Sequence, residues 1–176
     1  SKGNCYGLIG ANGAGKSTLV SIISGNKKAT EGKLIINNQI FDKGFFSVKQ
    51  ANENKIRITH QHPTISDELT VYEYCLISNQ RKNIKEKIKT IFEDWNFFID
   101  ITQKGKNLNA SEKFYVELLS ALISNPNFLI LDEPTVFLTL EQRNIFYDTK
   151  KKNCNLKQNN LCVILITHKI IEAQEL

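Results

Sequence analysis

A glycine-rich octapeptide near the start of the sequence contains the residue types that bind a polyphosphate. Residues 10–17 are G-A-N-G-A-G-K-S, which fits G-x-x-x-x-G-K-[ST] between an apolar run and a helical pattern. Glycines let backbone N–H groups turn inward and form an anion-binding nest at a helix N-terminus. We therefore expect Lys16 to reach the β- and γ-phosphates of a nucleoside triphosphate and the Ser17 hydroxyl to ligate Mg²⁺. The alternative is a glycine-rich turn that contains a lysine by chance, which the flanking strand and helix patterns disfavour.

Two adjacent carboxylates follow an apolar run much further along the chain. Residues 128–135 are F-L-I-L-D-E-P-T, which predicts a buried strand that ends at Asp132 and Glu133. Open α/β sheets bind ligands at the carboxyl ends of their strands, so both carboxylates should face the phosphate loop. We expect Asp132 to hold the Mg²⁺ shell and Glu133 to orient or deprotonate an attacking water. A capped turn is the alternative, and the phosphate loop in the same chain weighs against it. The residues expected to contact the nucleotide are Asn12, Gly13, Ala14, Gly15, Lys16, Ser17, Thr18 and Asp132.

The elements that must position these residues alternate between strands and helices. Apolar runs predict strands at about 5–10, 33–41, 55–60, 128–132 and 161–167, and helical spacing predicts helices at about 17–24, 71–79, 84–98, 111–124 and 140–152. Residues 42–54 are expected to form a polar loop. The last two strand runs are apolar throughout, which is typical of parallel strands covered on both faces. We predict an α/β P-loop fold with a mostly parallel central sheet, flanking helices, a short antiparallel strand region and a helical insertion.

The composition suits one globular domain and leaves its partners open. The chain has 176 residues, of which 41% are hydrophobic and 23% charged. No apolar run approaches the roughly 20 residues that span a bilayer. A net charge of +5 is compatible with nucleic acid, anionic lipid or an organelle matrix. The four cysteines lack metal-ligand spacing. Cys5 and Cys162 lie in apolar strand-like runs and are expected to be buried, reduced thiols, and Tyr6 is expected in the core.

Four motifs, taken in order, resemble the nucleotide-binding domain of ABC transporters. They are residues 10–18, Gln61, residues 131–135 and the pair Thr167-His168, and the resemblance extends from Gly7 to Leu176. It implies that Gln61 contacts Mg²⁺ and the attacking water, and couples the site to a transmembrane partner. It also implies that His168 bonds the γ-phosphate. The implied catalytic residues are Glu133, His168 and Gln61, and the implied metal-binding residues are Ser17, Gln61 and Asp132.

The same resemblance implies one ABC-type domain over residues 1–176, with a helical subdomain at about 69–124. The sequence L-T-V-Y-E at 69–73 is similar to the start of that subdomain. The short insertion and the pair His60-Gln61 are weakly similar to the ATP-binding subunit of haem export in cytochrome c maturation. The family's N-terminal strands and adenine-stacking aromatic are expected upstream of residue 1, because the sequence contains no methionine.

Two segments depart from the family pattern. Residues 108–112 are L-N-A-S-E where the family has L-S-G-G-Q, which clamps the γ-phosphate bound to the opposing subunit. Ala110 and Ser111 add Cβ atoms where close backbone approach is needed, and Glu112 adds a negative charge. Asn109 and Glu112 instead fit a helix capping box. Thr139 stands where an aspartate at the subunit interface is usual.

The resemblance implies an ATP-binding and ATP-hydrolysing subunit that drives a transmembrane transporter subunit through dimer closure. The residues that would bind this chain's own ATP fit the family pattern, whereas the segment that it would present to a partner's ATP is altered. We therefore expect a heterodimer with a second ABC-type subunit. One alternative is a structural subunit that binds nucleotide without productive turnover. Another is an ABC ATPase of translation or DNA repair, which the single cassette disfavours, so nucleic acid is not an expected partner. The expected location is the cytosolic or organelle-matrix face of a membrane, including the mitochondrial inner membrane.

Overall fold

The computed structural model describes residues 4–42, 46–60, 63, 65–79, 83–155 and 161–169. Its central sheet has four parallel strands in the order β1-β6-β5-β4. These strands are β1 (Cys5–Ile9), β4 (Ile56–Thr59), β5 (Phe128–Asp132) and β6 (Cys162–Thr167). An antiparallel hairpin of β2 (Lys33–Ile36) and β3 (Gln39–Asp42) forms a second, small sheet. The predicted α/β P-loop architecture is therefore confirmed.

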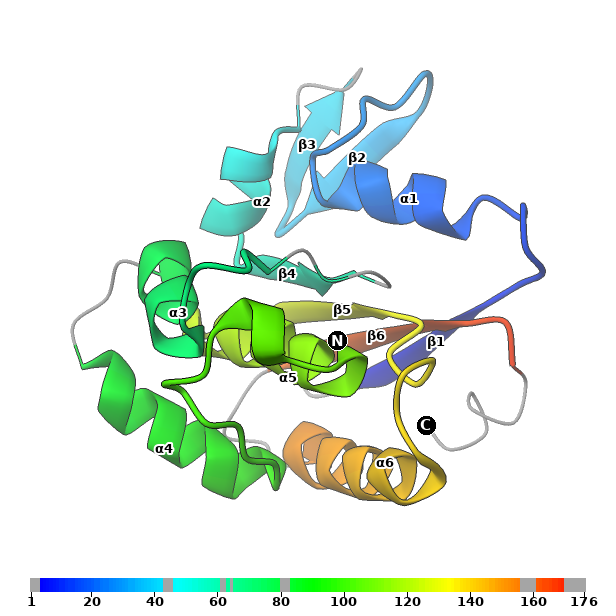
Figure 1. Cartoon of the computed structure of the whole chain (residues 1–176). Helices are drawn as coiled ribbons and strands as arrows, with labels where there is room; N and C mark the ends of the chain where they lie inside the picture. Colours follow the sequence, from blue (N-terminus) through cyan, green and yellow to red (C-terminus); the bar gives the residue numbers. More distant parts are fainter. Residues whose placement is uncertain are drawn as a thin grey trace.

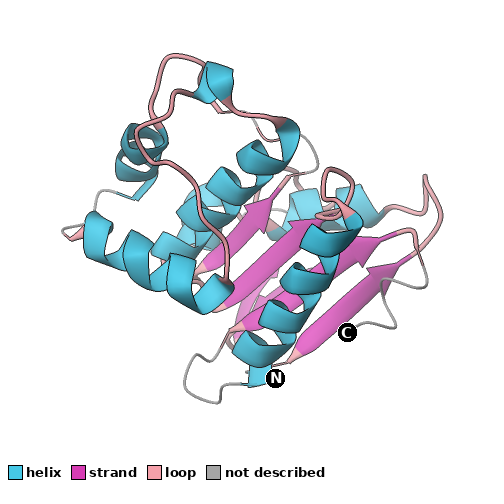
Figure 2. Ribbon diagram, turned by 60° about the horizontal axis from the view of Figure 1, so that its bottom comes forward, coloured by secondary structure: helices cyan, strands magenta, loops and turns pink. Residues whose placement is uncertain are grey.

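The helices pack on both sides of the central sheet. Figure 1 shows the hairpin with α1 and α2 on one side and α4, α5 and α6 on the other. Figure 2 shows the four strands side by side, with helices packed across the face that is turned forward. The helices are α1 (Lys16–Ile23), α2 (Val48–Glu53), α3 (Val71–Asn79), α4 (Ile84–Trp95), α5 (Ala110–Ile123) and α6 (Leu140–Asn155), with a 3-10 turn at Gly105–Asn107. None of the described helices has the length and apolarity that crossing a bilayer requires.

The two central strands are buried because helices or the hairpin layer cover both faces. Leu129, Leu131, Val163 and Leu165 are fully buried in one core cluster. Ile130 and Ile166 are buried in the other cluster, which accounts for the uninterrupted apolar runs. On α4 the buried side chains are Ile84, Ile88, Ile91 and Trp95, four of the five positions that the helical spacing predicts. The fifth, Phe98, is wrongly predicted, because the helix ends at Trp95 and Phe98 is 80% exposed beyond it.

The cysteines agree in part with the expectation that they are buried thiols. Cys75 and Cys162 are buried and Cys5 is half-buried. Burial raises the pKa of both buried thiols, that of Cys75 to about 12, so neither is a thiolate at neutral pH.

The expectation of a core position for Tyr6 is wrong. Its side chain is 43% exposed, because β1 lies at the sheet edge and pairs only with β6 among the described strands. The single strand expected at 33–41 is instead the β2–β3 hairpin. Asn37 and Asn38 both adopt left-handed conformations, with φ of 50° and 64°, as a tight two-residue hairpin turn requires.

The polar loop expected at 42–54 contains helix α2. Ser47 and Gln50 form a capping box there, in which the Ser47 hydroxyl accepts from the Gln50 N–H and the Gln50 side chain accepts from the Ser47 N–H. This helix buries only Ala51 within its six residues, so it lacks the apolar stripe by which longer helices are predicted.

Helix α5 begins with the capping box that the sequence predicts. The Asn109 side chain accepts from the Glu112 N–H at 3.0 Å, and the Glu112 carboxylate accepts from the Asn109 N–H at 2.8 Å. The charge of Glu112 is therefore held at the positive end of its own helix.

Candidate active site

The loop between β1 and α1 forms an anion-binding turn. Gly13 and Gly15 have φ of 83° and 91°, a left-handed backbone that other residues adopt only with strain. Gly15 immediately precedes α1, whose first turn has neither a side-chain cap nor an acidic residue. The N–H groups at this helix terminus are thus oriented for a negatively charged ligand.

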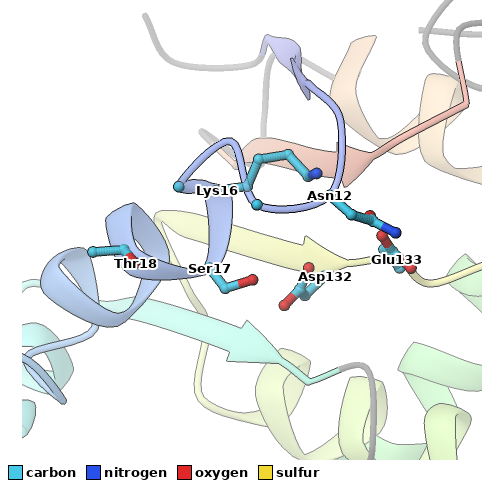
Figure 3. Close-up of a pocket in the computed structure, with 8 residues that line it drawn as sticks. Asn12, Lys16, Ser17, Thr18, Asp132 and Glu133 are labelled. Atoms are coloured by element: carbon cyan, nitrogen blue, oxygen red, sulfur yellow. The ribbon is translucent and has the colours of Figure 1, made fainter.

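A cleft of about 400 Å³ opens in front of this loop (Figure 3). Its lining residues are Asn12, Gly13, Gly15, Lys16, Ser17, Thr18, Asp132 and Glu133. All the expected nucleotide contacts line it except Ala14, whose N–H donates to the Ala11 carbonyl at 3.2 Å inside the loop. Lys16 Nζ donates to the carbonyls of Gly10 at 2.6 Å and Ala11 at 3.0 Å, which holds the ammonium group over the loop.

The two carboxylates lie where β5 ends. Figure 3 shows the Ser17 hydroxyl, from α1, pointing toward the Asp132 carboxylate at the end of β5. Burial raises the pKa of Asp132, and the neighbouring Glu133 charge raises it further, whereas His60 and Lys16 lower it. A divalent cation between Ser17 and Asp132 would favour the ionised carboxylate.

Glu133 adopts a left-handed conformation, with φ of 46°, and its N–H donates to the Ile166 carbonyl of β6 at 3.0 Å. Such a conformation is costly for a residue other than glycine and is found mostly where the position of a side chain matters. Here it turns the Glu133 carboxylate toward the end of β6.

His168 meets Glu133 at this edge of the sheet. Its Nδ1 lies 2.9 Å from Glu133 Oε1, and the Glu133 side chain is 13% exposed. The parallel register pairs Asp132 with Ile166, so the residues that follow the two strands come out side by side. The structure thus brings the predicted Glu133 and His168 together next to the phosphate loop.

Gln61 lies outside the described residues, but the strand before it ends at the same edge. Thr59 pairs with Leu131, so His60 emerges beside Asp132. The His60 N–H donates to Glu117 Oε2 at 2.7 Å. Glu117 is a functional candidate that the sequence analysis missed. The available signal was a carboxylate inside the apolar stretch 116–119 of a predicted helix.

Glu117 is 9% exposed, and this burial raises its pKa from 4.5 to about 7, although the His60 N–H opposes the rise. The folded chain therefore binds this proton more tightly than the unfolded chain. The resulting stability is complete below about pH 4.5 and is lost as the pH rises to about 7.

Glu117→Gln should remove this pH dependence. The difference in free energy of unfolding between Glu117→Gln and wild type should shift in favour of the variant by up to about 3 kcal/mol from pH 5 to pH 8. Urea unfolding of both proteins at the two pH values measures the difference. A difference that is the same at both pH values would contradict the raised pKa.

These residues fit a nucleoside triphosphate with Mg²⁺. Left-handed glycines, an uncapped helix terminus and Lys16 suit the phosphates, while hydroxyl and carboxylate oxygens are the ligands that Mg²⁺ prefers. Glu133 and His168 add a carboxylate with a bonded imidazole, an arrangement that can orient and deprotonate water. Together the sheet, the loop and the paired carboxylates define a P-loop nucleotide-binding domain.

Comparison with protein families is consistent with this description. The model of the family described as "ABC transporter" matches residues 1–136, so this chain belongs to the ABC transporter family. The resemblance on which the sequence analysis relied is therefore confirmed.

Curated relatives include three bacterial import or transport proteins. The ribose import ATP-binding protein RbsA of Clostridium perfringens is 35% identical, with 97% of this chain and 35% of that protein covered. A putative carbohydrate transport ATP-binding protein of Mycoplasma pneumoniae is 31% identical, with coverage of 96% and 32%. The nucleoside import ATP-binding protein NupA of Lactococcus lactis is 31% identical, with coverage of 98% and 35%. The chain thus spans about a third of the length of these relatives.

Solved cassettes share the fold. A dimeric bacterial ABC transporter cassette superposes with a TM-score of 0.82 at 21% identity, covering 99% of this chain and 79% of that one. A dimeric cassette in a post-hydrolysis state, bound to ADP and phosphate, gives a TM-score of 0.81 at 20% identity, with the same coverage.

Proposed function

We propose that this chain is the ATP-binding and ATP-hydrolysing domain of an ABC importer, which drives a transmembrane subunit through ATP-dependent dimer closure. The observation that supports this most strongly is the convergence of three segments at one edge of the sheet, two of which line the cleft while the third contacts Glu133. The loop at 10–18, the carboxylates that end β5 and the histidine that follows β6 are far apart in sequence and meet at one sheet edge.

Each side chain has a defined task in this proposal. The loop N–H groups and Lys16 bind the phosphates, and Ser17 and Asp132 hold Mg²⁺. The cation supplies charge neutralisation at the transferred phosphoryl group. Glu133 orients the attacking water and takes its proton, and Gln61 also acts on this water. His168 keeps Glu133 in place through the 2.9 Å contact and reaches the γ-phosphate.

The relatives guide the choice of transported substrate. Those named above are import or transport proteins for ribose, carbohydrate and nucleoside, which favours a sugar or nucleoside over haem. They are all bacterial, so the mitochondrial location and the haem-export similarity gain no support from them. We place the domain at the cytoplasmic face of a bacterial membrane.

The altered segment at the start of α5 supports a second candidate, a structural subunit that binds ATP with little turnover. In that segment Glu112 is engaged by the N–H of Asn109 on its own helix. Facing an opposing γ-phosphate, its charge would repel the anion, so two copies of this chain would close weakly on ATP. A partner with an intact L-S-G-G-Q would complete this chain's own half-site, which is why we favour a heterodimer.

Restoring L-S-G-G-Q by Asn109→Ser, Ala110→Gly, Ser111→Gly and Glu112→Gln should raise phosphate release by about tenfold or more. Serine and glutamine also form a capping box, so the cap that Asn109 and Glu112 make now would survive the exchange. Phosphate release per chain measures the effect, with Glu112→Gln alone as the control for charge. Absence of phosphate release by the restored chain, even with an intact partner cassette, would favour the structural subunit. Brisk turnover by the unaltered chain would show that the altered segment is tolerated.

We further propose that the transmembrane subunit docks on the helical subdomain, at about 69–124, near the stretch 61–79. On α3 the exposed apolar side chains are Leu76 and Ile77, which are 41% and 62% exposed. The sequence also offers Tyr72 and Tyr74 on this helix, but both are partly buried against the core, and the Lys85 ammonium lies 5.4 Å from the centre of the Tyr72 ring. The docking contact should therefore centre on Leu76 and Ile77.

A photo-cross-linking amino acid at Ile77 should capture the transmembrane subunit, whereas the same group at the exposed Lys89 of α4 should not. Mass spectrometry of the cross-linked product identifies the partner. Capture of the transmembrane subunit only from Lys89 would contradict docking on α3, and capture from neither position would leave the transporter interpretation without its partner.

A further inference from the structure

A buried carboxylate joins helix α5 to the end of β4. Glu117 lies in the middle of α5 among Val116, Leu118 and Leu119, all fully buried. Its Oε2 accepts the hydrogen bond from the His60 N–H at 2.7 Å. The two residues are far apart in sequence, so this bond fixes one structural element against another rather than completing a local turn.

Burying this carboxylate lowers the stability of the folded chain. A buried carboxylate loses its hydration, and burial raises the pKa of Glu117 to about 7. Burial raises the pKa of Tyr74, and the Glu117 charge raises it further. Tyr74 lines a small cavity of about 170 Å³ together with Glu117, Arg57 and Ser120. Burial is the main influence on the pKa of Glu117, and the hydrogen bond from the His60 N–H opposes it only in part. Selection for stability alone would favour an apolar residue here.

The position of Glu117 within α5 suggests what the carboxylate does. The helix begins at the capping box of Asn109 and Glu112 and packs against β4. Glu117 lies about 7.5 Å further along the same rigid helix, at 1.5 Å per residue. The Glu117 carboxylate accepts its hydrogen bond from the N–H of His60. His60 directly precedes Gln61 in the sequence and lies beside Asp132.

We propose that Glu117 is a positioning residue, which holds His60 at the end of β4, beside Asp132 and at the point from which the chain continues to Gln61. The inference rests on the proposed function, because that function assigns Asp132 and Gln61 a part in ATP hydrolysis.

Steady-state kinetics of Glu117→Ala and Glu117→Gln test the role. The alanine variant should lose about tenfold or more in kcat while its KM for ATP stays within about twofold, because Glu117 does not line the nucleotide cleft. The glutamine variant should keep at least about half of the wild-type kcat, since its side-chain carbonyl can accept from the His60 N–H. Ser120→Ala is the matched control: it lines the same cavity, and its hydroxyl faces Asn79 rather than His60. A wild-type kcat in Glu117→Ala, a loss as large in Glu117→Gln, or a rise in KM alone would overturn the proposal.

Amide hydrogen exchange gives a reading that does not require turnover. The His60 amide should exchange about tenfold or more faster in Glu117→Ala than in wild type, and within about threefold of wild type in Glu117→Gln. Equal His60 exchange in all three proteins would overturn the positioning role. A wild-type chain without phosphate release would refute the proposed function instead, and the exchange rates would still decide whether Glu117 holds the end of β4.

Discussion

Replacing Glu133 with glutamine is expected to stop ATP turnover and leave ATP binding intact. Glu133 follows the strand that bears Asp132, lies 2.9 Å from His168 and is largely shielded from water. Glutamine keeps the shape and hydrogen bonding of the side chain but cannot accept the proton of the attacking water. Loss of a positioned general base lowers the rate by about 10² to 10⁴-fold. Phosphate release should fall in that range, while the dissociation constant for Mg²⁺-ATP changes by less than about threefold.

Glu141→Gln, an exposed carboxyl-to-amide exchange in the first turn of α6, is the matched control and should hydrolyse ATP as wild type does. A detectable wild-type rate is a precondition. Turnover by Glu133→Gln at that wild-type rate would show that Glu133 is not the catalytic base.

Lys16→Ala should abolish ATP binding or weaken it by about tenfold or more, because it removes a charge-assisted contact of roughly 1.5–3 kcal/mol. Lys16 lines the cleft, and its ammonium already lies on the loop through the Gly10 and Ala11 carbonyls. Titration with labelled ATP in the presence of Mg²⁺ measures the loss. The exposed Lys27 beyond α1 offers Lys27→Ala as a control with the same charge change. Equal affinity of wild type and Lys16→Ala would refute the phosphate-binding role of the loop.

The parts of this structure that the sequence predicts are those set by local pattern. The apolar runs of β5 and β6 predict covered parallel strands because such strands bury both faces. Placing Asp132 and Glu133 at the ligand-binding edge needed only the rule that parallel strands end at one edge, and the phosphate loop needed only its spacing. His168 was placed there by the resemblance to the family. The capping box of Asn109 and Glu112 was likewise predictable, since it depends on residues three apart.

Other features depend on neighbours that a linear pattern does not contain. Tyr6 resembles a core residue within an apolar run, yet β1 pairs on one side only among the described strands, so the ring is exposed. Helix α2 is too short to show a helical stripe, and the Asn37-Asn38 turn was hidden inside one apolar run. The bond between Glu117 and His60 joins residues that only the packing of α5 against β4 brings together.

Phosphate release from Mg²⁺-ATP by the chain assembled with its membrane subunits tests the central claim most directly. The proposal predicts steady release by wild type and a loss of about 10²-fold or more in Glu133→Gln in the same assembly. Release at the same rate by both proteins, or ATP binding by the wild-type assembly without any release, would contradict the assignment of this cleft as an ATP-hydrolysing site.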